Sequence, residues 1–497
     1  MVVALLLAAL QATLVQADAS EALRIGSKRF TESYILAEVL QQAAARVGQP
    51  AVHKPGLGNT GILFAALRGG AIDVYPEYTG TIAREILAEP VDLDLAALNR
   101  RLAPLGLRAG VPLGFENTYA LAMREERAAQ LGIRTIGDLA AHPQLRLGLS
   151  QEFIGRGDGW AGLKARYRLP HATPSGLDHG LAYDAVAAGR IDVIDVYTTD
   201  AKIERFGLRV LEDDRRYFPR YDAVLLYRAD LPQRLPRAWE AMQSLGGAID
   251  AATMIRMNAA AEIDGASFAD AARQLHGTDA RVAPRSFLDL LFGGDFWRLT
   301  REHVFLVGAS VALSVVLGVP LGLLAARRER LGRVVLALVG IVQTVPSLAL
   351  LAFLIAALGT IGTVPALIAL VLYALLPIVR NTHAGIVGIR PGMRAAALAL
   401  GLSARDRLLS VELPLAAPTL LAGIKTSAVI NVGTATLAAF VGAGGYGERI
   451  VQGLALNDSR LMLAGALPAA ALALLAQWGF DHFERRLGAV RAQAASR

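Results

Sequence analysis

The 497-residue sequence contains no cysteine, which excludes disulfide bonds and thiolate metal sites. It also lacks the G-x-x-x-x-G-K-S/T phosphate-binding loop, so we do not expect the chain to bind ATP through that motif. No Asp or Glu occurs between Glu329 and Asp406. Because ion-coupled transporters use carboxylates inside the membrane, any transport by this chain is expected to draw its energy from a separate protein.

The residues that are present divide the chain into two unlike parts. Hydrophobic residues make up 54% of the sequence and charged residues 19%. The first value is high for a soluble protein, and the second is high for a protein that is wholly buried in the membrane. Charged residues are spread evenly from residue 23 to residue 301 and then collect between long apolar runs. We therefore predict a soluble part followed by a membrane part. The net charge of +7 lies largely in Arg clusters beside the apolar runs, so no nucleic-acid partner is expected.

The first 17 residues have the pattern of an export signal. Residues 2–15 are apolar and are followed by Gln16, Ala17 and the polar Asp18, as in a secretory signal peptide. No Lys or Arg precedes the apolar stretch. We interpret residues 1–17 as a signal peptide or an uncleaved anchor, with a buried helix of the soluble part as the alternative.

Five apolar stretches approach the length of about 20 residues that spans a bilayer. They lie at residues 303–326, 334–358, 363–380, 416–441 and 461–480. Arginines gather after the first, third and fifth stretches, whereas the other two connections are poor in basic residues. By the positive-inside rule the Arg-rich loops and the C-terminus are cytoplasmic, which puts the soluble part outside.

The cytoplasmic loop after the third stretch carries a spaced pattern. Residues 395–401 (AAALALG) are followed after nine residues by residues 411–414 (VELP). This resembles the EAA coupling motif of ABC-importer permeases, although Ala395 and Val411 replace the usual Glu and Ile. An ordinary amphipathic loop is the alternative. The resemblance implies two short helices that dock on a separate ATPase, with these coupling residues: Ala395, Ala396, Ala397, Gly401, Leu413 and Pro414.

Other segments of the membrane part support the same family. Residues 343–350 (QTVPSLAL), 373–382 (YALLPIVRNT) and 430–437 (INVGTATL) resemble the permeases of the glycine betaine/carnitine/choline ABC importers. Such permeases work in pairs, so the resemblance implies a homodimer with two ATPase subunits.

In the soluble part, short apolar strands alternate with amphipathic helical stretches, which predicts an α/β fold with largely parallel sheets. Residues 70–79 (GAIDVYPEYT) and 189–198 (GRIDVIDVYT) repeat one another. A duplicated unit that ends in tyrosine favours two similar lobes that face each other across a cleft, although chance can produce so short a match. Ligands in such sheets bind at the carboxyl ends of the strands.

Several segments resemble the substrate-binding proteins of the same osmoprotectant family. They are residues 25–33 (IGSKRFTES), 56–61 (GLGNTG), 73–81 (DVYPEYTGT), 117–121 (NTYAL) and 197–201 (YTTDA). The resemblance implies a two-lobed, type II periplasmic-binding-protein fold over residues 23–276. It is followed by a linker (277–297), an all-α polytopic permease domain (298–487) and a cytoplasmic tail (488–497).

The family's ligands carry a trimethylammonium group, which has no N–H to donate. Aromatic faces recognise such a cation, each contributing about 0.5 to 2 kcal/mol. The resemblance places the ammonium cage at Tyr78, Tyr119, Tyr197 and Tyr221. A tyrosine at a strand end can also simply pack the edge of a core.

A betaine also carries a carboxylate. The resemblance assigns Lys28, Thr81 and Arg156 to it, and Asn117 either touches the ligand or orients Tyr119. Alternatively Lys28 is a solvated charge and Arg156 forms a local ion pair with Asp158. We expect glycine betaine as ligand before choline, because the two cations would otherwise lack an anion.

We therefore expect an ABC-importer subunit in the bacterial cytoplasmic membrane, with its binding domain outside and without a cofactor, a metal or enzymatic chemistry. Choline, carnitine and ergothioneine remain alternative cargoes. A ligand-gated receptor or channel, and more remotely an exported enzyme with a membrane anchor, are the alternatives from other classes.

Overall fold

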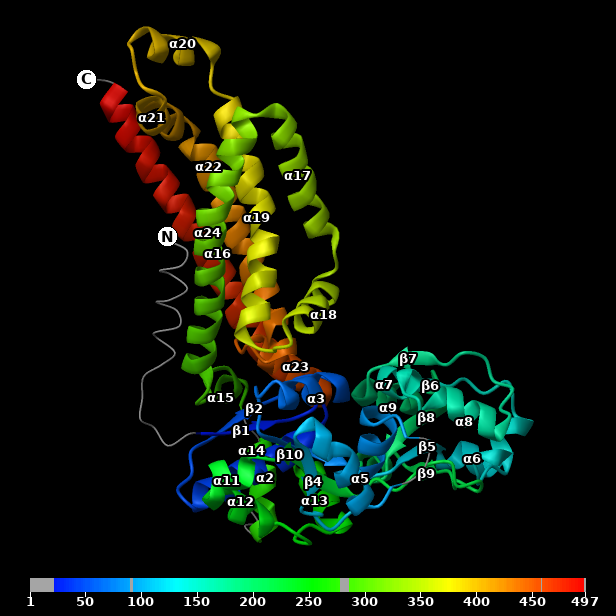
Figure 1. The fold of residues 1–497 in the computed structure, drawn as a ribbon. Coiled ribbons are helices and arrows are strands. Elements are labelled where there is room, and N and C mark those ends of the chain that lie inside the picture. The colour runs from blue at the N-terminus through cyan, green and yellow to red at the C-terminus, as the bar shows by residue number, and fades with distance from the viewer. Residues whose placement is uncertain (1–21, 90–92, 278–285, 457, 496–497) are drawn as a thin grey trace.

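The computed structural model describes residues 22–89, 93–277, 286–456 and 458–495, with side chains up to residue 486. The proposed signal segment, residues 1–17, lies outside the described residues. Figure 1 shows a two-lobed α/β domain at one end of a column of long helices. This is the predicted combination of a type II binding-protein fold with a helical permease domain.

Lobe 1 is built on a five-stranded sheet in the order β2-β1-β3-β10-β4. The strands are β1 (Leu23–Gly26), β2 (Ala51–Lys54), β3 (Val74–Tyr78), β4 (Leu107–Gly110) and β10 (Ala223–Arg228). The helices that matter most below are α2 (Thr31–Arg46), α3 (Thr60–Arg68), α4 (Thr79–Thr81) and α13 (Ala251–Glu262). Asn59 caps the start of α3 by accepting a hydrogen bond from the Ile62 backbone N–H.

Lobe 2 contains a three-stranded sheet in the order β8-β5-β9 and a β6-β7 pair. Its strands are β5 (Tyr119–Arg124), β6 (Gly148–Ser150), β7 (Ser175–Leu177), β8 (Val193–Tyr197) and β9 (Leu208–Val210). Its helices include α6 (Glu125–Leu131), α7 (Gln151–Gly155), α8 (Trp160–Tyr167) and α9 (His179–Ala187).

The prediction of largely parallel sheets is wrong. β1 runs parallel to β2 and β3, but β10 is antiparallel to β3 and β4, and β5 is antiparallel to β8 and β9. The reason is that β5 and β10 each follow a crossing from the other lobe. The two crossings pair with each other, since Glu116 and Asp222 form an antiparallel bridge. After the crossing, β5 and β10 each run antiparallel to the strands beside them.

The sequence repeat corresponds to equivalent structures in the two lobes. Both copies end as a strand that finishes in tyrosine, β3 at Tyr78 and β8 at Tyr197. In lobe 1, Arg24 binds Asp73 and donates to the Gly70 carbonyl oxygen at 2.5 Å. In lobe 2, Arg146 binds Asp192 and donates in the same way to the Gly189 carbonyl at 2.7 Å. The two lobes are thus similar units that face each other.

Four long helices account for four of the five predicted spans. They are α16 (Phe296–Arg327), α19 (Thr363–Val387), the continuous helical segment Ala404–Val441 and the Ser459–Arg486 part of α24 (Ser459–Ala495). The segment Ala404–Val441 comprises α21 (Ala404–Arg407), η5 (Leu408–Glu412), α22 (Leu413–Thr434) and η6 (Ala435–Val441). Helix α16 begins within the predicted linker, which also contains the short helix α15 (Phe287–Leu291).

The second predicted span, residues 334–358, is a bent pair of helices. Helices α17 (Glu329–Thr344) and α18 (Ser347–Leu358) meet at an angle of 100°. The bend lies at Val345 and Pro346, because a proline has no N–H to donate and disfavours the helical conformation in the residue before it. The column therefore has four continuous spans and one broken apolar pair.

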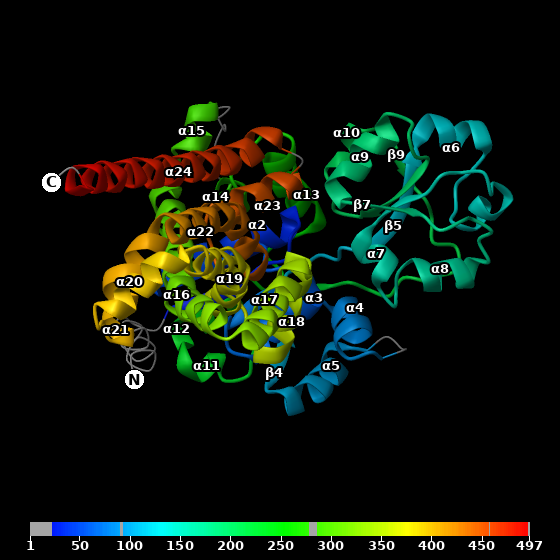
Figure 2. The same cartoon turned by 90° about the horizontal axis from the view of Figure 1, so that it is seen from above.

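The binding domain rests on the outer end of the helical column. Leu57, Leu63 and Leu67 of lobe 1 belong to one buried cluster with residues of α16, α18, α19 and η6. The close approach requires Gly69, because a Cβ there would lie 2.9 Å from the Gly359 carbonyl oxygen. Helix α9 of lobe 2 contacts α23 (Gly447–Leu456). Figure 2 shows the column over lobe 1, with most of lobe 2 beside it.

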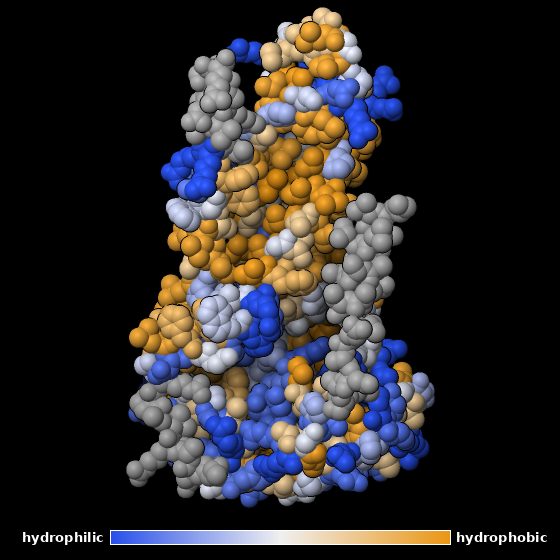
Figure 3. All heavy atoms as spheres, turned by 90° about the vertical axis from the view of Figure 1, so that its left-hand side faces the viewer, coloured by the Kyte–Doolittle hydropathy of each residue, from blue (hydrophilic) through white to orange (hydrophobic). Residues whose placement is uncertain are grey.

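The two ends of the column differ in what they carry. The short helices α20 (Pro391–Ala399) and α21, together with the C-terminal end of α24, lie at the end remote from the binding domain (Figure 1). Figure 3 shows hydrophobic side chains over much of the column between hydrophilic regions at either end. This arrangement agrees with the orientation predicted from the arginines.

Reporter fusions can test this orientation. Alkaline phosphatase, which is active only outside the cytoplasm, is expected to be inactive when fused after Arg497 and active when fused after Gly444. The reason is that the C-terminal end of α24 lies at the Arg-rich end of the column, whereas Gly444 is two residues after Gly442, where an added Cβ would meet Leu57 of lobe 1. A fluorescent protein that folds only in the cytoplasm serves as the reciprocal control. Phosphatase activity after Arg497 would contradict the topology.

Candidate functional site

All eight side chains predicted to contact a ligand line one cavity between the lobes. The cavity has about 290 Å³ of empty space. All eight residues are at most 9% exposed. The lining residues are Lys28, Phe30, Tyr78, Thr81, Asn117, Tyr119, Glu152, Arg156, Tyr197 and Tyr221. The structure thus brings together residues that lie up to 193 positions apart, and it adds Phe30 and Glu152 to the predicted set.

The strand arrangement explains why these residues meet. Tyr78 and Tyr197 are the last residues of β3 and β8, while Tyr119 is the first residue of β5. Because β5 is antiparallel to β8, its beginning lies beside the end of β8, and Tyr119 is the register partner of Tyr197. Tyr221 precedes β10 in the same way, beside the end of β3.

The aromatic rings form a compact cage. The Tyr119 and Tyr197 ring centroids are 4.9 Å apart, and their hydroxyl oxygens lie 3.2 Å apart. Phe30 closes the gap between lobes, with its centroid 5.4 Å from Tyr197 and 6.4 Å from Tyr78. Tyr221 meets Tyr119 edge to face at 6.0 Å. Burial raises the pKa of Tyr78, Tyr119 and Tyr197 well above the usual value, so these rings are neutral phenols at physiological pH.

The buried carboxylate of Glu32 holds two cavity residues in place by hydrogen bonds. Glu32 Oε1 accepts hydrogen bonds from Tyr78 Oη at 2.5 Å and from Asn117 Nδ2 at 2.9 Å. Its Oε2 accepts from Thr199 Oγ1 at 2.5 Å and from Asn258 Nδ2 at 3.2 Å. Burial raises the pKa of Glu32 although all four hydrogen bonds oppose the shift. The four donors come from lobe 1, the first crossing, lobe 2 and α13, so this group joins all parts of the binding domain.

Asn117 presents a polar atom that has no partner of its own. Its Nδ2 donates to Glu32, whereas its buried Oδ1 has no hydrogen-bond partner among the described residues. The residue lines the cavity and is 5% exposed. A carbonyl oxygen in this place can contact the positively polarised methyl groups of a quaternary ammonium ion.

The two cations of the cavity already have carboxylate partners. Lys28 Nζ lies 2.6 Å from Glu77 Oε1. Arg156 donates from Nε and Nη2 to the two oxygens of Asp158 at 2.7 and 2.6 Å. Burial is the largest single influence and opposes the ionisation of Asp158, but the hydrogen bonds from Arg156, its positive charge and the hydrogen bond from Tyr221 together lower the pKa of that carboxyl. These cations therefore do not need an anion from the ligand, and this reason for expecting a ligand with a carboxylate does not hold.

Both cations nevertheless keep unused donors. A Lys ammonium has three N–H donors and an Arg guanidinium has five. Lys28 donates one hydrogen bond to a side chain, and Arg156 donates none from Nη1 within the described part of the chain. A ligand carboxylate can therefore still be bound without breaking either ion pair.

Contacts across the cleft show that the lobes are closed. Arg156 Nη2 lies 3.4 Å from Thr81 Oγ1, and the Gly157 N–H donates to Glu85 Oε1 at 2.9 Å. Tyr221 Oη also donates to Asp158 Oδ2 at 2.6 Å. Since Arg156 and Asp158 follow α7 of lobe 2 while Thr81 and Glu85 belong to lobe 1, these bonds hold the cavity shut.

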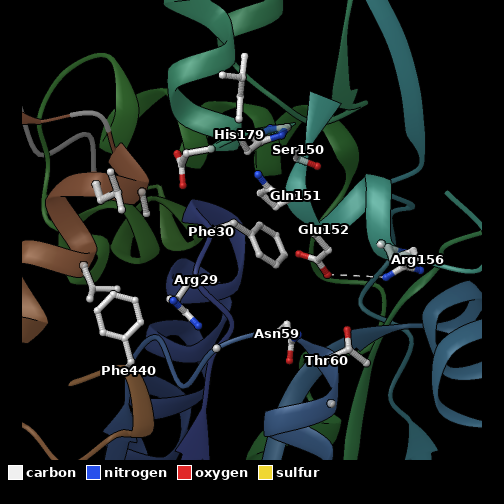
Figure 4. A pocket seen from close by; sticks show the side chains of 18 of the residues that line it. Arg29, Phe30, Asn59, Thr60, Ser150, Gln151, Glu152, Arg156, His179 and Phe440 are labelled. Carbon is white, nitrogen blue, oxygen red and sulfur yellow. Dashed lines mark ion pairs between the residues drawn. The ribbon is translucent and has the colours of Figure 1, made fainter. Parts of the chain in front are cut away.

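A second, larger cavity connects the cleft to the helical column. It measures about 1400 Å³ with the space at its open side, and four residues of the column line it: Phe440, Val451, Leu454 and Ala455. Figure 4 shows Phe30, Glu152 and Arg156 at the border with the cage cavity. The Arg29 guanidinium lies over the Phe440 ring, 4.7 Å from its centroid. The mouth of the binding cleft thus faces the permease domain.

His179 supports the cage tyrosine Tyr197 from outside. Its ring centroid is 4.5 Å from that of Tyr197, and its Nε2 lies 2.8 Å from Asp200 Oδ2. Burial alone would lower the pKa of His179. The negative charge of Asp200, with hydrogen bonds to Asp200 and Asp195, outweighs burial and raises the pKa to about 10. A charged imidazolium is therefore part of this wall at physiological pH.

The predicted coupling residues form a separate site at the far end of the column. Ala395, Ala396 and Ala397 lie on α20, Gly401 follows that helix, and Leu413 and Pro414 begin α22. Nearby apolar side chains are exposed, among them Leu398 at 58% and Leu400 at 79%. Three arginines surround the buried carboxylate of Glu412 at 3.4 to 4.0 Å: Arg327, Arg394 and Arg407.

Sequence reasoning missed the residues that hold or complete the cavity. Phe30 and Glu32 lie in the family-like segment 25–33, and Glu77 lies in the segment 73–81. Glu152 immediately precedes the glycine-containing stretch that carries Arg156. Proximity in the sequence to the predicted ligand-contacting residues was a signal for all of them, but only the folded chain shows which side chains pair.

Comparison with known families agrees with this geometry. The family model for the substrate-binding domain of ABC-type glycine betaine transport systems matches residues 21–275. The model for the binding-protein-dependent transport system inner membrane component matches residues 318–489. The two matches correspond to the two-lobed domain and to most of the helical column.

Individual relatives match one part or the other. The chain is 36% identical over 264 residues to a glycine-betaine-binding protein of Pseudomonas aeruginosa, which covers 49% of this chain and 84% of the relative. It is 40% identical over 184 residues to an osmoprotectant import permease protein of Salmonella typhimurium, covering 36% and 86%.

A Helicobacter pylori protein described as an ergothioneine transport permease/ergothioneine binding protein is 33% identical over 249 residues, covering 48% of this chain and 44% of the relative. Among solved structures, one of a glycine betaine/carnitine/choline ABC transporter is 28% identical. It covers 51% of this chain and 97% of that chain, with a TM-score of 0.45.

The charge of His179 predicts a pH dependence of stability. Since its folded-state pKa of about 10 exceeds the unfolded value near 6.5, its contribution is complete below about pH 6.5 and is lost as the pH rises toward 10. Chemical unfolding followed by circular dichroism from pH 6.5 to 9.5 should show a steeper loss for the wild type than for His179→Gln. Equal slopes would contradict the assigned charge.

Proposed function

Because this chain belongs to the family of ABC-type glycine betaine importers, with its substrate-binding domain and its permease domain in one polypeptide, we propose that it binds and imports a quaternary-ammonium osmoprotectant, glycine betaine before others. It is a multi-pass protein of the cytoplasmic membrane whose binding domain lies outside. The closed aromatic cavity between the lobes is the observation that supports the proposed ligand class.

The cavity suits a cation that cannot donate hydrogen bonds. Five aromatic rings surround it, from Phe30, Tyr78, Tyr119, Tyr197 and Tyr221. Ring faces attract a desolvated cation through the ring quadrupole. A primary ammonium ion would lose the hydrogen bonds of its hydration shell on entering this largely aromatic cavity, whereas a trimethylammonium group has no N–H to leave unpaired.

The remaining donors favour a ligand with a carboxylate. Arg156 Nη1 and the unused N–H groups of Lys28 lie at the border of the same cavity. A charge-assisted hydrogen bond contributes about 1.5 to 3 kcal/mol. The carboxylate of glycine betaine gains these bonds, whereas the hydroxyl of choline gains weaker ones. Carnitine and ergothioneine carry both groups and belong in any ligand panel.

Transport follows from the position of the cavity. The cleft opens toward Phe440 and α23, so a ligand released from the cage enters the space against the permease domain. Permeases of this type work with a separate ATPase. We place its docking surface on α20 and α21, with the exposed Leu398 and Leu400 as contacts. We also propose that two copies of the chain pair to form one pore, and that the chain itself catalyses no covalent reaction.

Two kinds of substitution separate cage from carboxylate contacts. Tyr197→Ala should weaken glycine betaine and choline alike, since both present the same trimethylammonium group. Lys28→Ala should weaken glycine betaine by roughly ten- to a hundredfold and choline much less. Calorimetric titration of the purified chain measures both. If Lys28→Ala leaves betaine binding unchanged, the carboxylate assignment is wrong although the importer family stands.

Gly401 offers a test of the coupling loop. It has a φ of +72° just after α20, a conformation that a residue with a side chain adopts at a cost of about 1 kcal/mol or more. Replacing Gly401 with Leu should abolish uptake and ligand-stimulated ATP hydrolysis while glycine betaine affinity stays at the wild-type value. Gly265→Leu is the matched control, because Gly265 has the same φ of +72° and an equally open surrounding but lies in the binding domain. Unimpaired uptake by the Gly401 variant would exclude the loop from the mechanism.

A further inference from the structure

Glu152 is an acidic residue that lines the proposed ligand cavity. Among the described residues, its carboxylate makes none of the hydrogen bonds that hold the cage or close the lobes. It belongs to α7, where Ser150 caps the helix by accepting from the Phe153 backbone N–H. Its carboxylate lines both the cage cavity and the larger cavity that faces the permease domain. Figure 4 shows it between the Phe30 ring and Arg156, pointing into the open space.

The other acidic groups at the cavity are already matched by a cation or by several hydrogen bonds. Glu77 pairs with Lys28, Asp158 pairs with Arg156, and Glu32 accepts four hydrogen bonds. In the described part of the chain, the salt-bridge partner of Glu152 is Arg156, with Nη1 at 3.8 Å from Glu152 Oε1. That separation is too long for a hydrogen bond. Glu152 therefore adds a negative charge that the cavity does not fully neutralise.

The charge acts on the cage itself. After burial, the negative charge of Glu152 is the next largest cause that raises the pKa of Tyr197, and it also raises the pKa of Tyr119. Both effects require the carboxylate to lie close to the rings that would surround the ammonium group. An anion in this place attracts any ligand with net positive charge and repels a ligand carboxylate.

Glu152 also faces the guanidinium nitrogen that a ligand carboxylate would use. Arg156 Nε and Nη2 are occupied by Asp158, which leaves Nη1 as the free donor group. Glu152 is the nearest carboxylate to that nitrogen apart from the Asp158 pair. A betaine carboxylate that binds Nη1 must approach or displace Glu152, whereas choline leaves the Glu152–Arg156 contact in place.

We propose that Glu152 is a specificity-determining residue that shifts the binding site toward cationic quaternary amines such as choline and away from zwitterionic ones such as glycine betaine. The proposal rests on the proposed quaternary-ammonium function. It means that the preference between the two ligand classes is a balance, in which Lys28 and Arg156 favour the carboxylate and Glu152 opposes it.

The test compares dissociation constants for glycine betaine and choline on the full chain purified in detergent. Glu152→Gln keeps the shape of the side chain and removes its charge. The ratio of the choline Kd to the glycine betaine Kd is expected to rise roughly tenfold, as for loss of one unit charge at close range in a partly solvated site. Glu152→Asp keeps the charge and should stay closer to the wild-type ratio.

Glu116→Gln is the matched control, because it removes the same charge from an exposed position outside the cavity. Its ratio should equal that of the wild type. An unchanged ratio in Glu152→Gln, or an equal loss of affinity for both ligands, would overturn the specificity role and leave the importer function standing. Absence of binding of either ligand by the wild type would overturn both proposals.

Discussion

The binding domain depends on the buried carboxylate of Glu32. This group accepts four hydrogen bonds from side chains of both lobes, the crossing segment and α13. An unpaired charge in such a place would cost several kcal/mol, so the four donors must all be in position when the lobes close. Tyr78 and Asn117, two of those donors, also line the ligand cavity. The closed state and the shape of the cage are therefore determined together.

Under the proposed function, a ligand in this cavity meets ring faces and charged groups more than it meets free hydrogen-bond donors and acceptors. Most polar atoms around the cage are already paired within the protein, as in the Lys28–Glu77 and Arg156–Asp158 pairs. These pairs offset the desolvation of the buried charges when no ligand is bound, and they leave specific donors free. Under the proposed function, selectivity between ligands depends on these few remaining groups.

The same contacts link the cavity to the membrane domain. Residues 28–30 include a cavity cation, the Arg29 that lies over Phe440, and the Phe30 that closes the cage. The cavity residues Lys28 and Phe30 are thus each one residue away from a contact with the permease domain. At the other end of the column, Glu412 pairs with arginines from α16, α20 and α21 near the start of α22, so these ion pairs connect the short helices α20 and α21 to the long helices.

The sequence by itself determined the two-part architecture and the orientation in the membrane, and its resemblance to a known family predicted eight of the ten residues that line the cavity. Apolar run length, Arg position and motif spacing are local properties, whereas Tyr119 reaches the cavity from the beginning of β5 only because that strand is antiparallel to β8. Only the tertiary structure decided the strand directions, the 100° bend at Pro346, and the partners of Lys28, Arg156 and Glu32. These depend on where the chain crosses between lobes and on which charges meet across distant segments, and no local pattern encodes such pairings.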